Sequence, residues 1–174
     1  GVLYDKHKKS ILCMLEKKNI KNYVIPNGIQ SIGDSAFWGC RDLINITIPD
    51  SVTSIGKRAF FECESLIDII IPNGVTKIEE STFYKCISLS SITIPNSVTK
   101  IESGVFFGCA SLESIRIPDS VIRIEESTFS YCDNLKNIII PKDVMSIGEK
   151  AFLGCVSLNR IMIPNSVIHI GDGV

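Results

Sequence analysis

The sequence carries almost no net charge, and this absence narrows the classes of partner. Eighteen Lys and Arg residues are balanced by 19 Asp and Glu residues, for a formal net charge of −1. Proteins that bind nucleic acid or an anionic membrane surface usually carry an excess of basic residues. We therefore expect no nucleic-acid partner, and binding must come from a local surface.

Long apolar runs are also missing. A membrane-spanning helix needs roughly 20 consecutive apolar residues. The apolar run ILCML at residues 11–15 is too short even for the core of a signal peptide. We expect no membrane insertion. Hydrophobic residues nevertheless make up 45% of the chain, which predicts a packed core rather than disorder.

Groups that could hold a metal ion are scarce. The chain has two histidines, His7 and His169, and no two cysteines stand in a C-x-x-C pair. Zinc sites need Cys and His ligands clustered at short spacing. We predict no metal site and no cofactor.

Proline is confined to seven positions, and their spacing reveals a repeat. Each proline follows the last by 23 residues, at positions 26, 49, 72, 95, 118, 141 and 164. Repeating Phe, Cys and Leu residues keep the same interval. A period of 20 to 29 residues is typical of a solenoid, in which each unit is stable only when it stacks on its neighbours.

The first part of the unit has the pattern of a strand. In the copy at 43–65, Ile46 and Ile48 alternate with Asn45 and Thr47, which predicts one buried and one exposed face. The proline then ends the strand because it has no N–H group to donate to a sheet.

The second part of the unit turns back toward the core. Val52 and Ile55 predict a second short strand, and the spacing of Ala59, Phe60 and Cys63 predicts a helical or 3₁₀ turn with these side chains on one face. The fold class is therefore an α/β solenoid with parallel strands on a concave face and the second strand and turns on the convex side.

The two ends differ from the repeats. Residues 1–19 break the register and predict an N-terminal cap, as a β-hairpin or, alternatively, an amphipathic helix from Lys8 to Ile20. Residues 20–174 form the repeat array, with about six full 23-residue repeats and a truncated one. Because the last unit stops before its Phe, we expect the parent chain to continue.

The phrase Y-x-I-P-[ND]-[GS]-[VI]-x-x-I-G-D-x-A-F, carried by residues 23–37, resembles the BspA-like leucine-rich repeat family. The resemblance covers about residues 20–174. It implies a cell-surface or secreted protein, an adhesin-like role toward a host extracellular or cell-surface protein, and no catalytic residue. A glycan is the alternative ligand.

The cysteines of the repeat are predicted to be packing residues rather than chemical groups. Stacked coils bring equivalent Cα atoms to about 5 Å, but their parallel Cβ vectors disfavour a disulfide. A column of buried thiols that behave as small hydrophobes fits the spacing better. The predicted column contains Cys40, Cys63, Cys86, Cys109, Cys132 and Cys155. Cys13 lies outside this register and is the one thiol flagged as reactive.

The outward side of the strands is the predicted binding face. Concave strand faces of repeat proteins commonly bind partners, and apolar residues here have nothing obvious to cover them. The alternative is that β-propensity alone placed Thr and Ile at these positions. The predicted partner-binding residues are Asp68, Ile70, Ser91, Thr93, Ser114, Arg116, Asn137, Ile139, Arg160 and Met162.

Two other columns offer surfaces for binding. One follows the repeating Phe and contains Trp38, Phe61, Tyr84, Phe107, Ser130 and Leu153. We expect it to pack between turns, with sugar stacking as the alternative. The other contains the pairs Lys77/Glu79, Lys100/Glu102 and Arg123/Glu125, for which we expect a solvated ladder of salt bridges rather than an ionic binding patch.

Three functions follow from these patterns. The favoured one is a non-enzymatic protein-binding or adhesion module of a surface protein. The alternative is a structural spacer or assembly segment of a larger multidomain surface protein. A β-helix enzyme acting on polysaccharide is remote, because acid–base catalysis needs clustered carboxylates and the strand face carries only Asp68.

Overall fold

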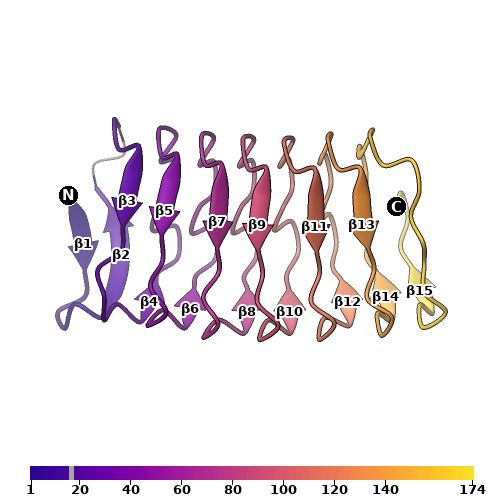
Figure 1. The fold of residues 1–174 in the computed structure, drawn as a ribbon, viewed down its shortest axis with the longest axis horizontal. Coiled ribbons are helices and arrows are strands. Elements are labelled where there is room, and N and C mark those ends of the chain that lie inside the picture. Colours follow the sequence, from indigo (N-terminus) through magenta and orange to yellow (C-terminus); the bar gives the residue numbers. More distant parts are fainter. Residues whose placement is uncertain (16–17) are drawn as a thin grey trace.

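The computed structural model describes residues 1–15 and 18–174 of the chain. Figure 1 shows a short hairpin followed by coils that stack side by side along one axis, with the two termini at opposite ends. The described residues contain fifteen strands and no helix. They contain no helix that is both long enough and apolar enough to cross a membrane.

Each coil contributes one longer and one shorter strand. The longer strands are β3 (Asn22–Val24), β5 (Asn45–Thr47), β7 (Asp68–Ile70), β9 (Ser91–Thr93), β11 (Ser114–Arg116) and β13 (Asn137–Ile139). The shorter strands are β4 (Ser31–Ile32), β6 (Ser54–Ile55), β8 (Lys77–Ile78), β10 (Lys100–Ile101), β12 (Arg123–Ile124), β14 (Ser146–Ile147) and β15 (His169–Ile170). All pairs between coils are parallel, and paired residues stand 23 positions apart. The predicted parallel solenoid is confirmed.

The chain begins with an antiparallel pair, β1 (Val2–Tyr4) and β2 (Ser10–Met14). The Asp5 carboxylate accepts hydrogen bonds from the backbone of Lys9 and Ser10 at 2.6 and 2.9 Å, which closes the turn and lowers the pKa of Asp5. β2 also pairs in parallel with β4, so the hairpin continues the ladder of shorter strands. The stretch 10–14 is therefore a strand rather than part of a helix; residues 16 and 17 lie outside the described residues, and the boundary at 19/20 stays a prediction.

The core is a set of columns that run along the stack. In the copy at 43–65, Ile46 is buried while Asn45 and Thr47 are exposed, as the alternation predicts. The repeating Phe rings form one continuous column from Phe37 to Phe152, with centroids 5.3–5.8 Å apart and ring planes within 12° of parallel. Packing between coils is therefore the main source of buried apolar surface.

The predicted helical or 3₁₀ turns are not found; the A-F-x-x-C segment is a series of β-turns. Its backbone N–H groups alternate in direction. In the first coil, Ala36, Trp38 and Cys40 donate to the carbonyl three residues earlier, while Ser35 and Phe37 donate to the next coil. Residues in the left-handed region at two positions per coil, such as Ser35 (φ 56°), reverse the chain direction. A helix cannot continue through such residues because half of its N–H groups would point away from its axis.

The ladder of shorter strands is interrupted at two of the three coils in which a glutamate replaces a glycine. The N–H groups of Gly33, Gly56, Gly148 and Gly171 donate to the preceding coil at 2.7–2.8 Å. Among the described residues, the equivalent bond is 3.0 Å at Glu102 and is absent at Glu79 and Glu125. The reason is steric, because a Cβ at Gly148 would lie 2.5 Å from the backbone N of Glu126. A side chain at this position therefore crowds the preceding coil; at Glu102 the bond is longer than at the glycines but is kept.

Candidate functional site

The strand face is defined here as the outward side chains of the longer strands and of residues 160–162. Parallel pairing places equivalent positions next to one another, as with Ser114 beside Asn137 and Arg116 beside Ile139. All ten residues predicted for binding lie on this face and are exposed. The structure therefore brings them together, while the concavity of the face stays a prediction.

Large apolar side chains stand in solvent on this face. Val24, Ile70, Ile139 and Met162 occupy equivalent positions and are 68%, 64%, 80% and 73% exposed. Isolated apolar residues at a surface are ordinary, but Ile139 and Met162 are neighbours in this column and form an exposed apolar pair of the kind that can mark an interaction site. The polar column beside them is partly linked, since the Asn45 amide donates to Asn22 at 2.8 Å.

The C-terminal half of the strand face is hollowed. One groove of about 540 Å³ lies between β13 and the following segment and is lined by Asn137, Ile138, Ile139, Ile140, Lys142, Arg160, Met162, Ile163 and Pro164. A smaller groove of about 250 Å³ adjoins it and is lined by Ile115, Arg116, Ile117, Asp119, Ile139 and Pro141. Ile139 lines both grooves, so the two adjoin at its side chain.

Lys142 belongs to this site although the sequence patterns had not marked it. It stands directly after Pro141, in a column that otherwise contains Asn27, Asp50, Asn73, Asn96, Asp119 and Asn165. Aligning the repeats by their prolines would have shown it as the single cation of that column. Sequence reasoning concentrated on the strand residues and so missed the turn.

The aromatic column packs against itself. Tyr84 stacks between Phe61 and Phe107 with centroids 4.6 Å from each, and Tyr131 contacts Phe107 edge-on at 5.2 Å. Ser130 interrupts the column and is buried, where its hydroxyl donates to the carbonyl of Lys150. Because the ring faces of Tyr84 are covered by its neighbours, the middle of this column is not a platform for stacking sugars.

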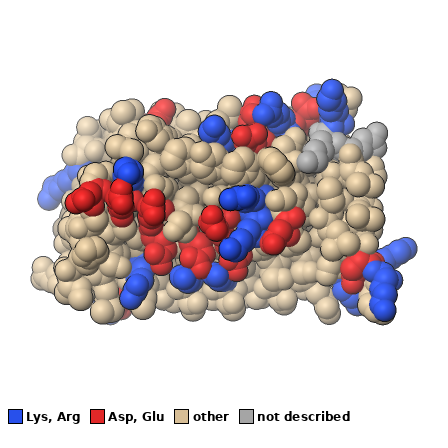
Figure 2. Space-filling view, turned by 180° about the vertical axis from the view of Figure 1, so that it is seen from behind, with Lys and Arg blue, Asp and Glu red and all other residues tan. Residues whose placement is uncertain are grey.

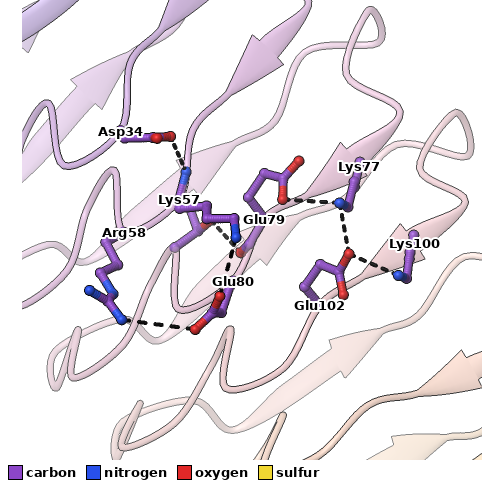
Figure 3. A network of polar contacts seen from close by, with 9 residues as sticks. Asp34, Lys57, Arg58, Lys77, Glu79, Glu80, Lys100 and Glu102 are labelled. Carbon is purple, nitrogen blue, oxygen red and sulfur yellow. Dashed lines mark hydrogen bonds and ion pairs between the residues drawn. The ribbon is translucent and has the colours of Figure 1, made fainter.

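Charged side chains gather on another side of the molecule, seen from behind in Figure 2. Lys77 bridges Glu79 and Glu102 at 3.0 and 2.7 Å, and Lys100 joins Glu102 at 2.8 Å, as Figure 3 shows. These bonds raise the pKa of Lys77, with Glu102 the larger cause. Burial would raise the pKa of Glu102, but hydrogen bonds from Lys100 and Lys77 outweigh it and lower that pKa. The predicted pair Arg123/Glu125 makes no ion pair in the described structure.

The repeating cysteines lie inside the stack. Cys40, Cys63, Cys86, Cys109 and Cys132 are buried, Cys155 is half-buried, and none of the chain's seven cysteines, all within the described residues, forms a disulfide. Each thiol from Cys63 onward donates to the carbonyl of the Phe 26 residues earlier, at 3.0–3.2 Å. Burial raises the pKa of Cys86, Cys109 and Cys132 well above its usual value and that of Cys155 to about 11. Cys13, flagged as reactive, is partly exposed.

Metal binding has no geometric support in the described part of the chain. No group of three or more His, Cys, Asp or Glu side chains there is placed to hold an ion. The mixed network around Glu102 instead neutralises its own charges through three short ion pairs.

A stack of 23-residue coils with parallel strand pairing between coils, an inner Phe column and an exposed strand face defines a leucine-rich repeat solenoid. The BspA type leucine rich repeat region matches in six copies over residues 13–136 and 55–174. The chain belongs to this family, which confirms the resemblance read from the sequence. The comparison with curated proteins gave no match.

Solved structures of bacterial leucine-rich repeat proteins share the fold. A leucine rich cell surface protein from Faecalibacterium prausnitzii is 32% identical, covers 99% of this chain and superposes with a TM-score of 0.86. A leucine-rich repeat protein from Bacteroides ovatus is 29% identical over 99% of the chain, with a TM-score of 0.78. One from T. pallidum is 30% identical over 91% of the chain, with a TM-score of 0.70.

The chain is shorter than most of these relatives. It spans 48% of the Faecalibacterium protein and 54% of the Bacteroides protein, but 87% of the T. pallidum protein.

Proposed function

We propose that this chain is a non-enzymatic protein-binding module of a cell-surface or secreted protein, with its partner bound on the strand face. One observation carries the proposal: the column with Ile70, Arg116 and Ile139 stands exposed on stacked parallel strands. Membership of the BspA type family and similarity to a protein described as a cell surface protein support the proposed location.

Physical reasons favour binding by this face. A backbone already ordered in a sheet loses little freedom when a partner binds, and burying exposed Ile side chains removes apolar surface from water. Arg is enriched among residues that dominate interface energies. The proposed partner is an extracellular or cell-surface protein of a host, with a glycan as the alternative ligand.

The test is a binding screen of the chain against extracellular matrix proteins and a glycan array. It includes a variant with Ile70→Asp, Arg116→Glu and Ile139→Asp. The control carries Ile122→Asp, Arg123→Glu and Ile168→Asp, which makes the same chemical changes at exposed sites off the strand face. Thermal unfolding must show that all three proteins are folded.

We expect the parent and the control to bind a common ligand and the strand-face variant to bind it at least about tenfold more weakly. Equal loss in both variants would move the site off the strand face. Absence of binding by the parent would overturn the module and favour the spacer or assembly segment.

A further inference from the structure

The last coil leaves the ladder of longer strands beside β13. The backbone of Ser157 still donates to Asp133 at 3.2 Å, and contact resumes where Ile168 donates to Met145 at 2.9 Å. Between these points, no backbone hydrogen bond joins β13 to the described residues 159–163. Figure 1 shows the last coil diverging from β13 before it reaches β15. β13 is therefore an open sheet edge on the side away from β11.

The open edge forms one wall of the larger groove described above. Ile138 and Ile140 supply its buried floor, and Ile139, Met162 and Ile163 stand exposed around it. Its volume of about 540 Å³ falls within the range of specific binding sites and accommodates several side chains. An exposed sheet edge with alternating apolar positions is the arrangement that captures an extended peptide as an added strand.

The charged residues that line the larger groove have one sign. Lys142 and Arg160 are the only ionisable groups among the residues that line the larger groove. Arg116 lies beside them in the smaller groove, where Asp119 is the only acidic residue. Among the described residues, none of these three cations makes an ion pair. Unpaired cations around an apolar floor are complementary to carboxylates carried on an apolar chain.

We propose that the groove beside β13 binds an extended peptide segment of a protein partner, with apolar side chains alternating with Asp or Glu. The peptide backbone pairs with the open edge of β13, and its apolar side chains lie on the inward side, beside Ile138 and Ile140. Its carboxylates face Lys142 and Arg160. This assignment rests on the proposed function, since it names the class of partner that the strand face takes.

The probe is a fluorescein-labelled peptide of about ten residues in which valine alternates with glutamate, long enough to span the strand. Two matched peptides carry lysine in place of glutamate, or proline in place of alternate valines. Fluorescence anisotropy follows binding to the full chain at about 0.05 and 0.5 M salt. We expect saturable binding of the acidic peptide, weaker binding at high salt, and no binding of the lysine or proline peptides, since proline lacks the N–H group.

The protein variants separate the groove from the rest of the surface. Lys142→Glu with Arg160→Glu should weaken binding of the acidic peptide at least about tenfold. The control, Lys6→Glu with Lys21→Glu, makes the same change in net charge at exposed residues near the other end of the stack and should bind as the parent does. Equal affinity of all three proteins, or no saturation up to about 1 mM peptide, would overturn the proposal.

Two further results distinguish this proposal from the function on which it rests. In the first, a ligand found in the binding screen is lost with the strand-face variant but still binds the Lys142→Glu, Arg160→Glu variant and is not displaced by excess peptide. This result would support the strand-face module and overturn the proposal that the groove binds a peptide. In the second, the acidic peptide binds in the groove but the screen finds no ligand. This result would support the groove and overturn the strand-face module. Self-association of the chain that is abolished by the groove variant would assign the edge to a second copy and overturn the peptide assignment.

Discussion

The position of the repeating cysteines from Cys63 onward is explained by the backbone carbonyl group to which each thiol donates a hydrogen bond. Cys86, for example, donates to the Phe60 carbonyl at 3.1 Å, and the backbone N–H of Cys63 donates to the same oxygen at 3.1 Å. The thiol thus adds a hydrogen bond between coils while filling an apolar site. A larger side chain would overpack this fully buried site, and alanine would remove the thiol donor.

The burial of these thiols predicts a loss of stability at high pH. Their folded-state pKa is raised above the usual 9.0, so their contribution is complete below about pH 9 and is lost as the pH rises toward the folded value. Each thiol should lower the free energy of unfolding by about 1.4 kcal/mol per pH unit in that range. Urea unfolding with a reductant at about pH 7 and pH 10 measures the fall.

A variant with Cys86→Ala and Cys109→Ala isolates this effect from the titration of Tyr and Lys. It should be less stable than the parent at about pH 7, because the thiol hydrogen bonds are lost, yet it should lose less stability on going to about pH 10. Parallel losses in both proteins would show that the thiols do not carry the alkaline transition.

At the scale of the element, the shorter strands depend on glycine. Gly56, Gly148 and Gly171 let one coil approach another so closely that a Cβ would meet backbone atoms at 2.5–2.6 Å. Glu79 and Glu125 stand at the same place in coils whose ladder bond is missing. The change from Gly to Glu that the sequence displays as a charge pattern therefore accompanies the loss of a ladder bond in two coils, while Glu102 keeps its bond at 3.0 Å.

The change Gly148→Ala tests this explanation. Its Cβ would lie 2.5 Å from the Glu126 nitrogen and 2.7 Å from the Glu125 carbonyl carbon, so the coil must shift and the bond from residue 148 to Ile124 should lengthen or break. We expect a loss of about 1–3 kcal/mol in the free energy of unfolding, measured by urea denaturation. Ser114→Ala on the exposed strand face is the control and should change it by less than about 0.5 kcal/mol. An unchanged midpoint for Gly148→Ala would refute the steric account.

At the scale of the whole molecule, stability is distributed along a stack rather than concentrated in one centre. Each coil contacts its two neighbours, so a central Phe has two ring partners and the terminal one has a single partner. Phe83 lies between Phe60 and Phe106, at 5.5 and 5.8 Å, whereas Phe152 stacks only on Phe129.

Truncating these rings should therefore have unequal effects. Phe83→Ala should lower the free energy of unfolding by about 3–5 kcal/mol, because it removes a fully buried ring from the middle of the column. Phe152→Ala should cost less, since it opens a smaller cavity at the end of the stack. Equal losses in chemical denaturation would mean that the solenoid unfolds without regard to position and would contradict the nearest-neighbour account.

The repeat itself was predictable because its signals are local and periodic. Alternation places Ile46 inside and Asn45 and Thr47 outside, and the 23-residue interval of Phe and Cys requires stacking. The turns were mispredicted because the spacing of Ala59, Phe60 and Cys63 is the same for a helix and for a series of β-turns. What separates the two is the direction of each N–H group, and here half of them point to a neighbouring coil.

By itself, then, the sequence determined the solenoid, its period, its inward columns and the residues of its exposed strand face, since burial follows from hydrophobic periodicity. Only the tertiary structure decided where hydrogen bonds between neighbouring coils are lost. The missing ladder bonds at Glu79 and Glu125 and the open edge of β13 beside Lys142 and Arg160 depend on distances between coils 23 residues apart. Such distances are set by steric contact between backbones, which no pattern within one repeat encodes.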